Sequence, residues 1–541
     1  MRGRGAGVVL MLLVAAGAAG CSSHASPPDL SGYYTQRLAW RTCGAAGLTD
    51  SARKDLGEAA ASATLASMEC AQLTVPRDYG HPQAGDLRLA LSRFRAAPDH
   101  VQPGGARVGS LVLNFGGPGT PGIDQLGAEV DTTFAGLRRS YDLIGLDPRG
   151  WGQSEPVTCA RSAESEESEE SADAGQAAWA AWAADAARTG DDPLAELTRV
   201  AAARTARARA CGVRSGTLLP YVGTVDSARD LDVLRAALGD RKLNFLGFSY
   251  GSRLGAVYAH QFPERVGRMS LDGIIDPTLD YEGTAVSLVQ AQEQGVGNFL
   301  ADCLRRGDAC PFTGSQAEAR QQLQVAYDAV GQKGVESNKG TLDRSTFVNA
   351  LADAAWEPGW WPDLRGALTD LIRSHDAGPL ARLGGATPPT GAAFPAVADP
   401  PGDNGSAVYT AVECRDTADR YSPQRTAAAR TEFLAASSLF GPGAETSLLD
   451  CSGWPARGDD SWRDVRAKGA PPVLMVGTRT DPATPYPGTA RMATATGVGV
   501  VLTYAGEGHI AYRLSTCVRH AEDAFLTSGT LPKPDTVCPA E

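Results

Sequence analysis

The pentapeptide Gly247-Phe248-Ser249-Tyr250-Gly251 constrains the fold more than any other segment of this chain. It follows the apolar run Leu-Asn-Phe-Leu and precedes a helix-like stretch that begins near Tyr250. A Gly-x-Ser-x-Gly motif between a buried strand and a helix forms a sharp turn that lifts the serine hydroxyl above a sheet, and glycine tolerates the crowding there. We therefore predict that Ser249 is a nucleophile. The alternative is a serine that only caps the following helix.

The rest of the chain has the alternating pattern that such a turn requires. Short runs rich in Val, Ile and Leu alternate with helix-like stretches, which is typical of a mostly parallel sheet flanked by helices. This pattern predicts an α/β fold with a mostly parallel sheet flanked by helices. We expect core strands within 109–117, 141–150, 242–249, 267–275, 471–481 and 499–509, and an antiparallel edge hairpin within 70–80 and 86–96.

Two stretches interrupt this alternation. Residues from about 157 to 220 contain an acidic run, which we interpret as a solvated loop, and an Ala-rich helical stretch. Residues 276–469 are mainly helical in pattern and then rich in Pro and Gly, which predicts an inserted cap or lid. The expected domains are a signal peptide at 1–20, a tether at 21–35, the α/β core at 36–275 and 470–541, and the cap at 276–469.

The N-terminus indicates export. Arg2 and Arg4 precede an apolar run that is too short to span a bilayer comfortably. This run ends in Ala-Ala-Gly-Cys, which resembles a bacterial lipobox, although Ala18 stands where that motif usually has Leu. We expect an extracellular or cell-surface protein with Cys21 as its lipidated first residue, so that the lipid makes the membrane contact. Ordinary secretion without a lipid is the alternative.

Ten further cysteines, an even number in an exported chain, predict a disulfide framework. They form no CxxC pair and the chain has no HExxH motif, so we expect no metal site. The sequence alone does not fix the connectivity, but pairing neighbours closes local loops that each contribute about 2–4 kcal/mol. That pairing is Cys43–Cys70, Cys159–Cys211, Cys303–Cys310, Cys414–Cys451 and Cys517–Cys538.

A serine hydroxyl is a weak nucleophile unless a base removes its proton, and His509 is the histidine best placed to do so. It lies on a Gly-flanked loop directly after the last predicted strand. Catalytic groups of open α/β sheets gather at that edge of the sheet. The other histidines fall in the tether, at the edge hairpin, in the cap or on helices: His24, His81, His100, His260, His375 and His520.

The acid that orients His509 should precede it, in the order Ser, acid, His. Asp481 meets this condition, since it directly follows the first predicted strand after the cap. Its Asp-Pro sequence also favours a turn, which is compatible with the catalytic role. Asp272, at the end of an earlier strand, is the alternative acid.

The oxyanion of acyl transfer requires preorganised N–H donors. The Gly/Pro-rich loop after the strand at 109–114 places Gly116 and Gly117 near one donor, and the N–H of Tyr250, after the nucleophile, should be the other. These groups are sufficient for a two-step acyl transfer, so we expect no metal or organic cofactor.

Several motifs together resemble the proline iminopeptidase and tripeptidyl aminopeptidase group of α/β-hydrolases. They are GGPG at 116–119, GLDPRGWGQS at 145–154, GFSYGS at 247–252, RTDPATP at 479–485 and GEGH at 506–509. With its export signal, the chain is most similar to the exported tripeptidyl aminopeptidases of actinobacteria, from about Tyr34 to the C-terminus. The resemblance implies a serine peptidase that releases tripeptides or other short peptides from free N-termini.

The resemblance also implies acidic residues, often in the cap, that bind the ammonium group of the substrate. The segment AVECRDTA at 411–418 resembles a recurring family segment and offers Glu413 and Asp416 for this role. The alternative for these two acids is an ion pair with Arg415 or Arg420.

The expected partners are therefore peptides with a free N-terminus. A net charge of -12 and the lack of a basic patch argue against nucleic acids, and we expect a monomer. A carboxylesterase or lipase-type hydrolase with the same triad is one alternative function. A non-catalytic peptide-binding lipoprotein is another, although the intact Ser, Asp and His count against it.

Overall fold

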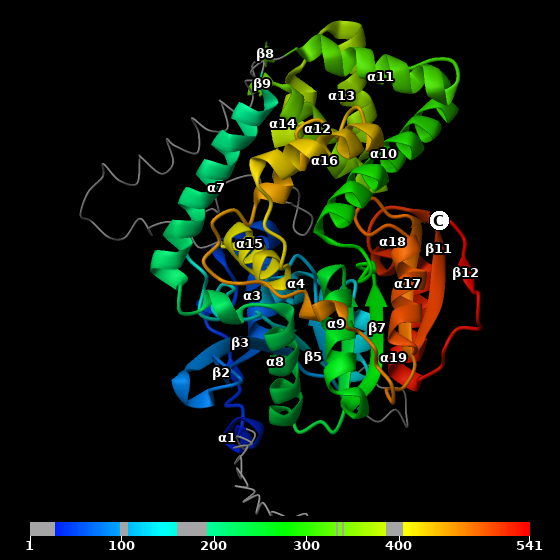
Figure 1. Cartoon of the computed structure of the whole chain (residues 1–541). Coiled ribbons are helices and arrows are strands. Elements are labelled where there is room, and N and C mark those ends of the chain that lie inside the picture. The colour runs from blue at the N-terminus through cyan, green and yellow to red at the C-terminus, as the bar shows by residue number, and fades with distance from the viewer. Residues whose placement is uncertain (1–27, 98–106, 160–191, 332–333, 338–339, 386–403) are drawn as a thin grey trace, which may run out of the picture.

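A ten-stranded sheet forms the centre of the computed structural model, which describes residues 28–97, 107–159, 192–331, 334–337, 340–385 and 404–541. The strand order is β1-β2-β3-β5-β4-β6-β7-β10-β11-β12 (Figure 1). The strands are β1 (Arg41–Thr42), β2 (Glu69–Pro76), β3 (Asp86–Phe94), β4 (Gly109–Asn114), β5 (Tyr141–Leu146), β6 (Leu243–Phe248), β7 (Val266–Asp272), β10 (Val473–Thr480), β11 (Gly499–Glu507) and β12 (Val537–Cys538). The predicted signal peptide, Cys21 and the acidic run at 164–175 lie outside the described residues.

The pairing of the strands agrees with the α/β-hydrolase fold. All neighbours from β5 to β12 pair in parallel, whereas β1, β2, β3 and β5 pair antiparallel to one another in that order. The six predicted core strands and the edge hairpin are confirmed. The sequence did not predict β1 and β12, because strands of two residues are too short to show a period.

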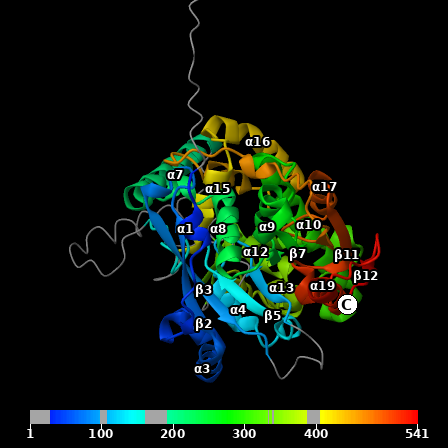
Figure 2. The same cartoon turned by 90° about the horizontal axis from the view of Figure 1, so that it is seen from below.

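Helices cover both faces of the sheet and bury it on both sides. On β4, Leu111 and Leu113 contribute to one core and Val112 to the other, as expected when successive side chains alternate between faces. The first core contains residues of α4 (Gly122–Glu129) and α19 (Thr516–Ser528), and the second contains residues of α8 (Thr224–Ala237) and α9 (Tyr250–Gln261). Figure 2 shows these two pairs of helices on opposite sides of the strands.

A mainly helical cap lies over the carboxyl ends of the strands (Figure 1). Its helices share a separate hydrophobic core, and a short hairpin of β8 (Val335–Ser337) and β9 (Gly340–Leu342) adjoins them. The helices are α10 (Tyr281–Arg305), α11 (Gln316–Val330), α12 (Arg344–Trp356), α13 (Trp361–Ser374), α14 (Gly378–Gly385) and α16 (Pro423–Ala436).

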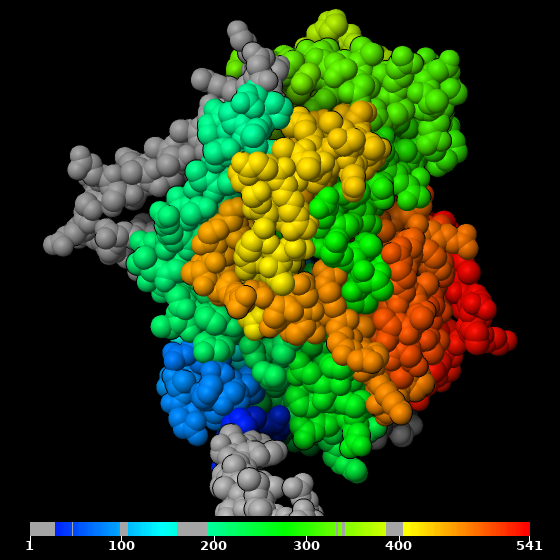
Figure 3. Space-filling view, in the orientation of Figure 1, coloured from blue at the N-terminus to red at the C-terminus, as the bar shows by residue number. Residues whose placement is uncertain are grey.

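The cap does not correspond to the continuous segment 276–469 that the sequence predicts, because one helix from outside this segment packs in the cap and one helix from inside it packs on the sheet. Helix α7 (Pro193–Ser215), from the earlier insertion, buries Leu197 and Val200 in the cap core. Helix α15 (Gly405–Asp416), from within the expected cap, instead buries Ala411 and Val412 against the sheet side. Figure 3 shows the chain after residue 404 crossing the front of the molecule beside α7. Periodicity shows that a helix buries one face, but not which body covers it.

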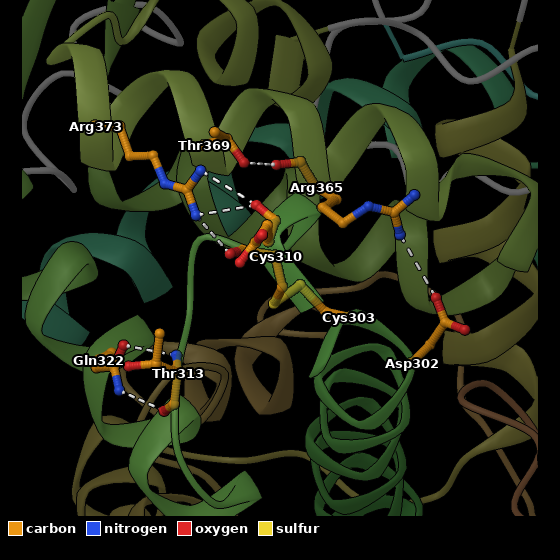
Figure 4. The surroundings of a disulfide bond; sticks show 9 residues. Asp302, Cys303, Cys310, Thr313, Gln322, Arg365, Thr369 and Arg373 are labelled. Carbon is orange, nitrogen blue, oxygen red and sulfur yellow. Dashed lines mark hydrogen bonds and ion pairs between the residues drawn. A yellow bond between two sulfur atoms is a disulfide. The ribbon is translucent and has the colours of Figure 1, made fainter. Parts of the chain in front are cut away.

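Five disulfides join the cysteines in the neighbour pairing given above. The bond between Cys303 and Cys310 closes the loop from α10 to α11 (Figure 4). Arg373 of α13 points to this loop and donates hydrogen bonds to the carbonyl oxygens of Asp308 (3.3 Å) and Cys310 (2.7 Å). A covalent and a hydrogen-bonded link therefore fix this part of the cap.

The N-terminal end of the described chain lies at the pole of the molecule opposite the cap (Figure 1). There, helix α1 (Ser31–Tyr34) packs beside α8, and the Tyr34 hydroxyl donates a 2.6 Å hydrogen bond to the buried Asp232 carboxylate. This contact fixes where the chain enters the folded body.

Candidate active site

Ser249 stands at a tight turn between β6 and α9. Its φ of 54° is in the left-handed region, which is uncommon for a residue other than glycine and is typical of strained functional turns. The Ser249 N–H donates a 2.8 Å hydrogen bond to the Asp272 carbonyl oxygen. A Cβ atom at Gly247 would lie 2.5 Å from the Gly251 carbonyl oxygen, so the turn closes only with glycine at that position. The local sequence thus places the hydroxyl at the end of β6.

His509 and Asp481 form a buried pair at the ends of the neighbouring strands β11 and β10. His509 Nδ1 lies 2.9 Å from Oδ2 and 3.0 Å from Oδ1 of Asp481. The Thr484 backbone N–H (2.8 Å) and hydroxyl (2.9 Å) also donate to the Asp481 carboxylate and fix its orientation. A carboxylate on Nδ1 requires the imidazole proton there, which leaves the Nε2 lone pair to act as a base.

The His509 ring and the Ser249 turn both contact the Asp272–Gly273 segment. A Cβ atom at Gly273 would lie 2.9 Å from His509 Cε1, while the preceding Asp272 carbonyl accepts the Ser249 N–H. Nε2 is buried and has no hydrogen-bond partner among the described residues. No hydrogen bond joins it to Ser249 in this structure, as is common in unliganded enzymes, where such contacts tighten on substrate binding.

Asp272, the alternative acid, contacts a different group. Its Oδ2 accepts a 2.8 Å hydrogen bond from the Tyr512 backbone N–H, beyond the histidine in the chain. Burial raises the pKa of the Asp272 carboxyl to about 6, although the Tyr512 N–H and the charge of His509 oppose the rise. Of the two acids, Asp481 is therefore the one that bonds to the His509 imidazole.

The cap also contacts the histidine, through Trp356 at the end of α12. The Trp356 carbonyl oxygen accepts a 3.1 Å hydrogen bond from the His509 N–H. The two rings meet edge to face, with centroids 4.9 Å apart. The sequence does not indicate this residue, because no pattern connects two segments that lie so far apart in the chain. The backbone position of His509 thus depends on the cap as well as on the sheet.

Two backbone N–H groups beside Ser249 are free to bind an oxyanion. Among the described residues, neither Gly117 nor Tyr250 donates its N–H to a protein acceptor. The Gly116 N–H is already bonded to Asn114 Oδ1 at 3.2 Å, which leaves Gly117 as the better donor of the two glycines. Tyr250 is the first residue of α9, where N–H groups have no partner within the helix and the helix dipole favours negative charge.

Glu413 and Asp416 form ion pairs, but not with the two arginines that the sequence suggested. Both carboxylates face Arg253 on α9, at 2.9 Å from Glu413 and 3.3 Å from Asp416. Arg415 and Arg420 instead donate to backbone carbonyl oxygens. The cluster links α15 to the helix that follows the nucleophile.

The Arg253 cluster is buried. Asp416 also accepts the Thr224 N–H at 2.9 Å, and the Arg253 guanidinium lies over the Trp462 ring, 4.2 Å from its centroid. Burial raises the pKa of the Asp416 carboxyl to about 6, against the opposing charge of Arg253. Two carboxylates and one guanidinium leave the cluster with an excess of negative charge.

We expect Arg253→Met to destabilise the protein. The change leaves Glu413 and Asp416 without a buried cation, and breaking such a pair costs about 3–5 kcal/mol. Without Arg253 the pKa of the Asp416 carboxyl rises further, so the loss should be larger at pH 8 than at pH 5, where this acid can take a proton. Chemical denaturation at both pH values measures this. Arg466→Met removes an exposed ion pair and is the control; equal losses in both variants would contradict the prediction.

The fold and the site together define a serine hydrolase of the α/β-hydrolase class. A strained serine, a buried Asp-His pair and two free N–H groups meet at the carboxyl ends of a mostly parallel sheet. Family models agree: residues 110–370 match the model described as alpha/beta hydrolase fold, and residues 437–538 match the model described as TAP-like protein.

Known relatives extend the match to most of the chain. The tripeptidyl aminopeptidase of Streptomyces lividans is 31% identical over 87% of this chain and 83% of its own length. The serine protease Hip1 of Mycobacterium tuberculosis is 29% identical over 87% of each chain. Carboxylesterase B of the same organism is 30% identical over 88% of this chain and 87% of its own. The chain belongs to the tripeptidyl aminopeptidase family of α/β-hydrolases and is a serine peptidase.

Proposed function

We propose that this peptidase is an aminopeptidase that releases tripeptides or other short peptides from free N-termini. One observation carries the proposal. Asp481 and His509 form a buried pair at 2.9 Å, and the unpaired Nε2 lies beside the segment that also holds Ser249. The names of two relatives, a tripeptidyl aminopeptidase and a serine protease, support peptides as the substrate class.

The proposed reaction has two acyl-transfer steps. Ser249 Oγ attacks the scissile carbonyl carbon while His509 Nε2 accepts the hydroxyl proton, and the N–H groups of Gly117 and Tyr250 bind the oxyanion. His509 then protonates the leaving amine, which departs as the shortened peptide. Water, deprotonated by His509, hydrolyses the ester on Ser249 and releases the short acyl product. Asp481 holds the imidazole and stabilises its cationic form throughout.

We further propose that the Arg253 cluster supplies the anion for the substrate's ammonium group. Its excess negative charge suits a cationic ligand. The Glu413 side chain is 15% exposed, against 4% for Asp416, so Glu413 is the more accessible of the two acids.

We also propose that the mature protein is exported, works as a monomer and carries a lipid on Cys21. The five disulfides suit an oxidising compartment outside the cytoplasm. Among the described helices, none is long and apolar enough to cross a bilayer.

A panel of substrates tests the proposed function. We expect the mature protein to cleave a free-amine Ala-Ala-Pro chromogenic amide, and to cleave the N-acetylated tripeptide and the single-residue Pro amide at least tenfold more slowly. A short-chain ester is included because one relative is named a carboxylesterase. Turnover of the ester without any amide would reject the aminopeptidase, and equal rates on free and acetylated tripeptides would reject recognition of the amine.

A further inference from the structure

Two buried carboxyl groups lie behind the segment that carries His509. Asp272 ends β7, Glu522 lies on α19, and neither side chain is exposed to solvent. Glu522 Oε1 accepts a 2.7 Å hydrogen bond from the Ser270 hydroxyl. Ser270 precedes Asp272 by two residues on β7, so both side chains lie on the same face of the strand. Glu522 and Asp272 are therefore neighbours.

Each of these carboxyl groups has one satisfied oxygen and one unsatisfied oxygen. Asp272 Oδ2 accepts the Tyr512 N–H, whereas Asp272 Oδ1 is buried without a partner. Glu522 Oε2 is likewise buried without a partner. A buried oxygen without a donor is costly. A proton on Glu522 removes one of the two buried charges, since the charge of Asp272 acts on this acid.

The charges around the pair favour one proton over none. Neither acid forms an ion pair with a Lys or Arg among the described residues. The titratable groups near the pair are His509 and Tyr512 on the histidine segment, Asp481 at the end of β10 and Asp523 on α19. Asp523 accepts a 2.7 Å hydrogen bond from the Tyr512 hydroxyl. Two adjacent buried carboxylates cannot both remain ionised under these conditions.

The two acids differ in how well their surroundings stabilise the charged form. Burial, and then the charge of Asp272, raises the pKa of Glu522 well above its ordinary value. Asp272 receives the Tyr512 N–H and lies near His509, both of which lower its pKa. The proton therefore belongs on Glu522 and the negative charge on Asp272.

We propose that Glu522 is a neutral acid near the Asp272 carboxylate, and that this pair positions His509. Asp272 holds the Tyr512 N–H at the start of α18 (Ala511–Leu514). Ile510, between the histidine and this helix, has a φ of 70°, a strained conformation for a β-branched residue that persists only where its surroundings fix it. Glu522 is thus a positioning residue that acts through Asp272.

The pair gives a signed dependence of stability on pH. Because Glu522 keeps its proton in the folded protein but releases it near pH 4.5 when unfolded, unfolding releases a proton above that pH. Stability then falls as pH rises, up to the raised pKa of the folded state. Glu522→Gln cannot ionise. We expect the melting temperature of this variant, relative to that of the wild type, to increase as pH rises from 5 to 8.

Infrared spectroscopy tests the proton directly. The difference spectrum between the wild type and Glu522→Gln at neutral pH should contain the C=O stretching band of a protonated carboxylic acid, shifted in D₂O. His520→Gln, on the exposed side of the same helix, is the control and should leave this band unchanged. Absence of the band from the wild type, or a melting-temperature difference that does not change with pH, would overturn the proposal.

Kinetics test the positioning role. We expect Glu522→Leu to lower kcat about tenfold with little change in KM, and Glu522→Gln to restore most of the loss and extend activity to higher pH. A Glu522→Leu enzyme with wild-type kcat and pH profile would contradict this role. If that variant does not fold, the Gln variant and the infrared band decide. The effect on rate rests on the proposed triad, but the band and the melting temperatures do not, so the two proposals can fail separately.

Discussion

Ser249→Ala is expected to lower kcat/KM for the tripeptidyl amide by about 10⁴-fold to 10⁶-fold. The alanine variant cannot form the acyl-enzyme, and the oxyanion donors and the binding groups alone supply only the residual rate. Hydrolysis of the amide at saturating enzyme measures the loss. A fluorophosphonate should label Ser249 in the wild type and leave the variant unlabelled, as mass spectrometry of the peptide containing residue 249 would show.

Ser528→Ala is the matched control for this experiment, since Ser528 lies on the exposed end of α19, away from the turn at Ser249. It should keep both the rate and the label. A Ser249→Ala protein that retains a tenth of the wild-type rate would contradict the nucleophile. A wild type that binds peptides but neither reacts with the fluorophosphonate nor turns over would favour the binding lipoprotein.

Asp481→Asn is expected to lower kcat by about 10⁴-fold while leaving the fold intact. The amide would present N–H rather than oxygen to His509 Nδ1, which favours the tautomer with the proton on Nε2, where the base must be free. The amidolysis rate of the purified variant, together with its circular dichroism, measures this.

Asp272→Asn provides the comparison, because the two acids were the alternatives for this role. Its side chain keeps an oxygen for the Tyr512 N–H, so we expect a loss of about tenfold, the scale of a displaced base rather than a missing one. If the two variants reversed in order, Asp272 would be the orienting acid and the 2.9 Å contact between His509 and Asp481 would not be the catalytic one.

The sequence carried most of the information about the sheet and its catalytic loops. Strands show a period and glycines mark the turns, so Ser249, Asp481 and His509 could each be placed at the end of a predicted strand. The carboxyl ends of parallel strands meet at one edge, which is why residues so far apart in the chain could be grouped without a structure.

Contacts between separate bodies could not be read in the same way. The edge-to-face contact of Trp356 with His509 and the ion pairs of Arg253 with Glu413 and Asp416 join segments with no common pattern. The sequence therefore suggested Arg415 or Arg420 as the ion-pair partner of these two acids, whereas the partner is Arg253. The sequence predicts helix within the regions 157–220 and 276–469, which hold α7 and α15, but which core each helix joins depends on packing that periodicity does not encode.

The position of the N-terminal end of the folded body would determine the orientation of the enzyme relative to the membrane if Cys21 carries a lipid. Helix α1 lies at the pole farthest from the cap (Figure 1). From Cys21 to Pro28 a fully extended chain spans at most about 25 Å. A lipid on Cys21 would thus keep this pole close to the membrane and hold the cap and the carboxyl ends of the strands away from it. Such an enzyme would be expected to act on peptides in the medium rather than on chain ends embedded in the same membrane.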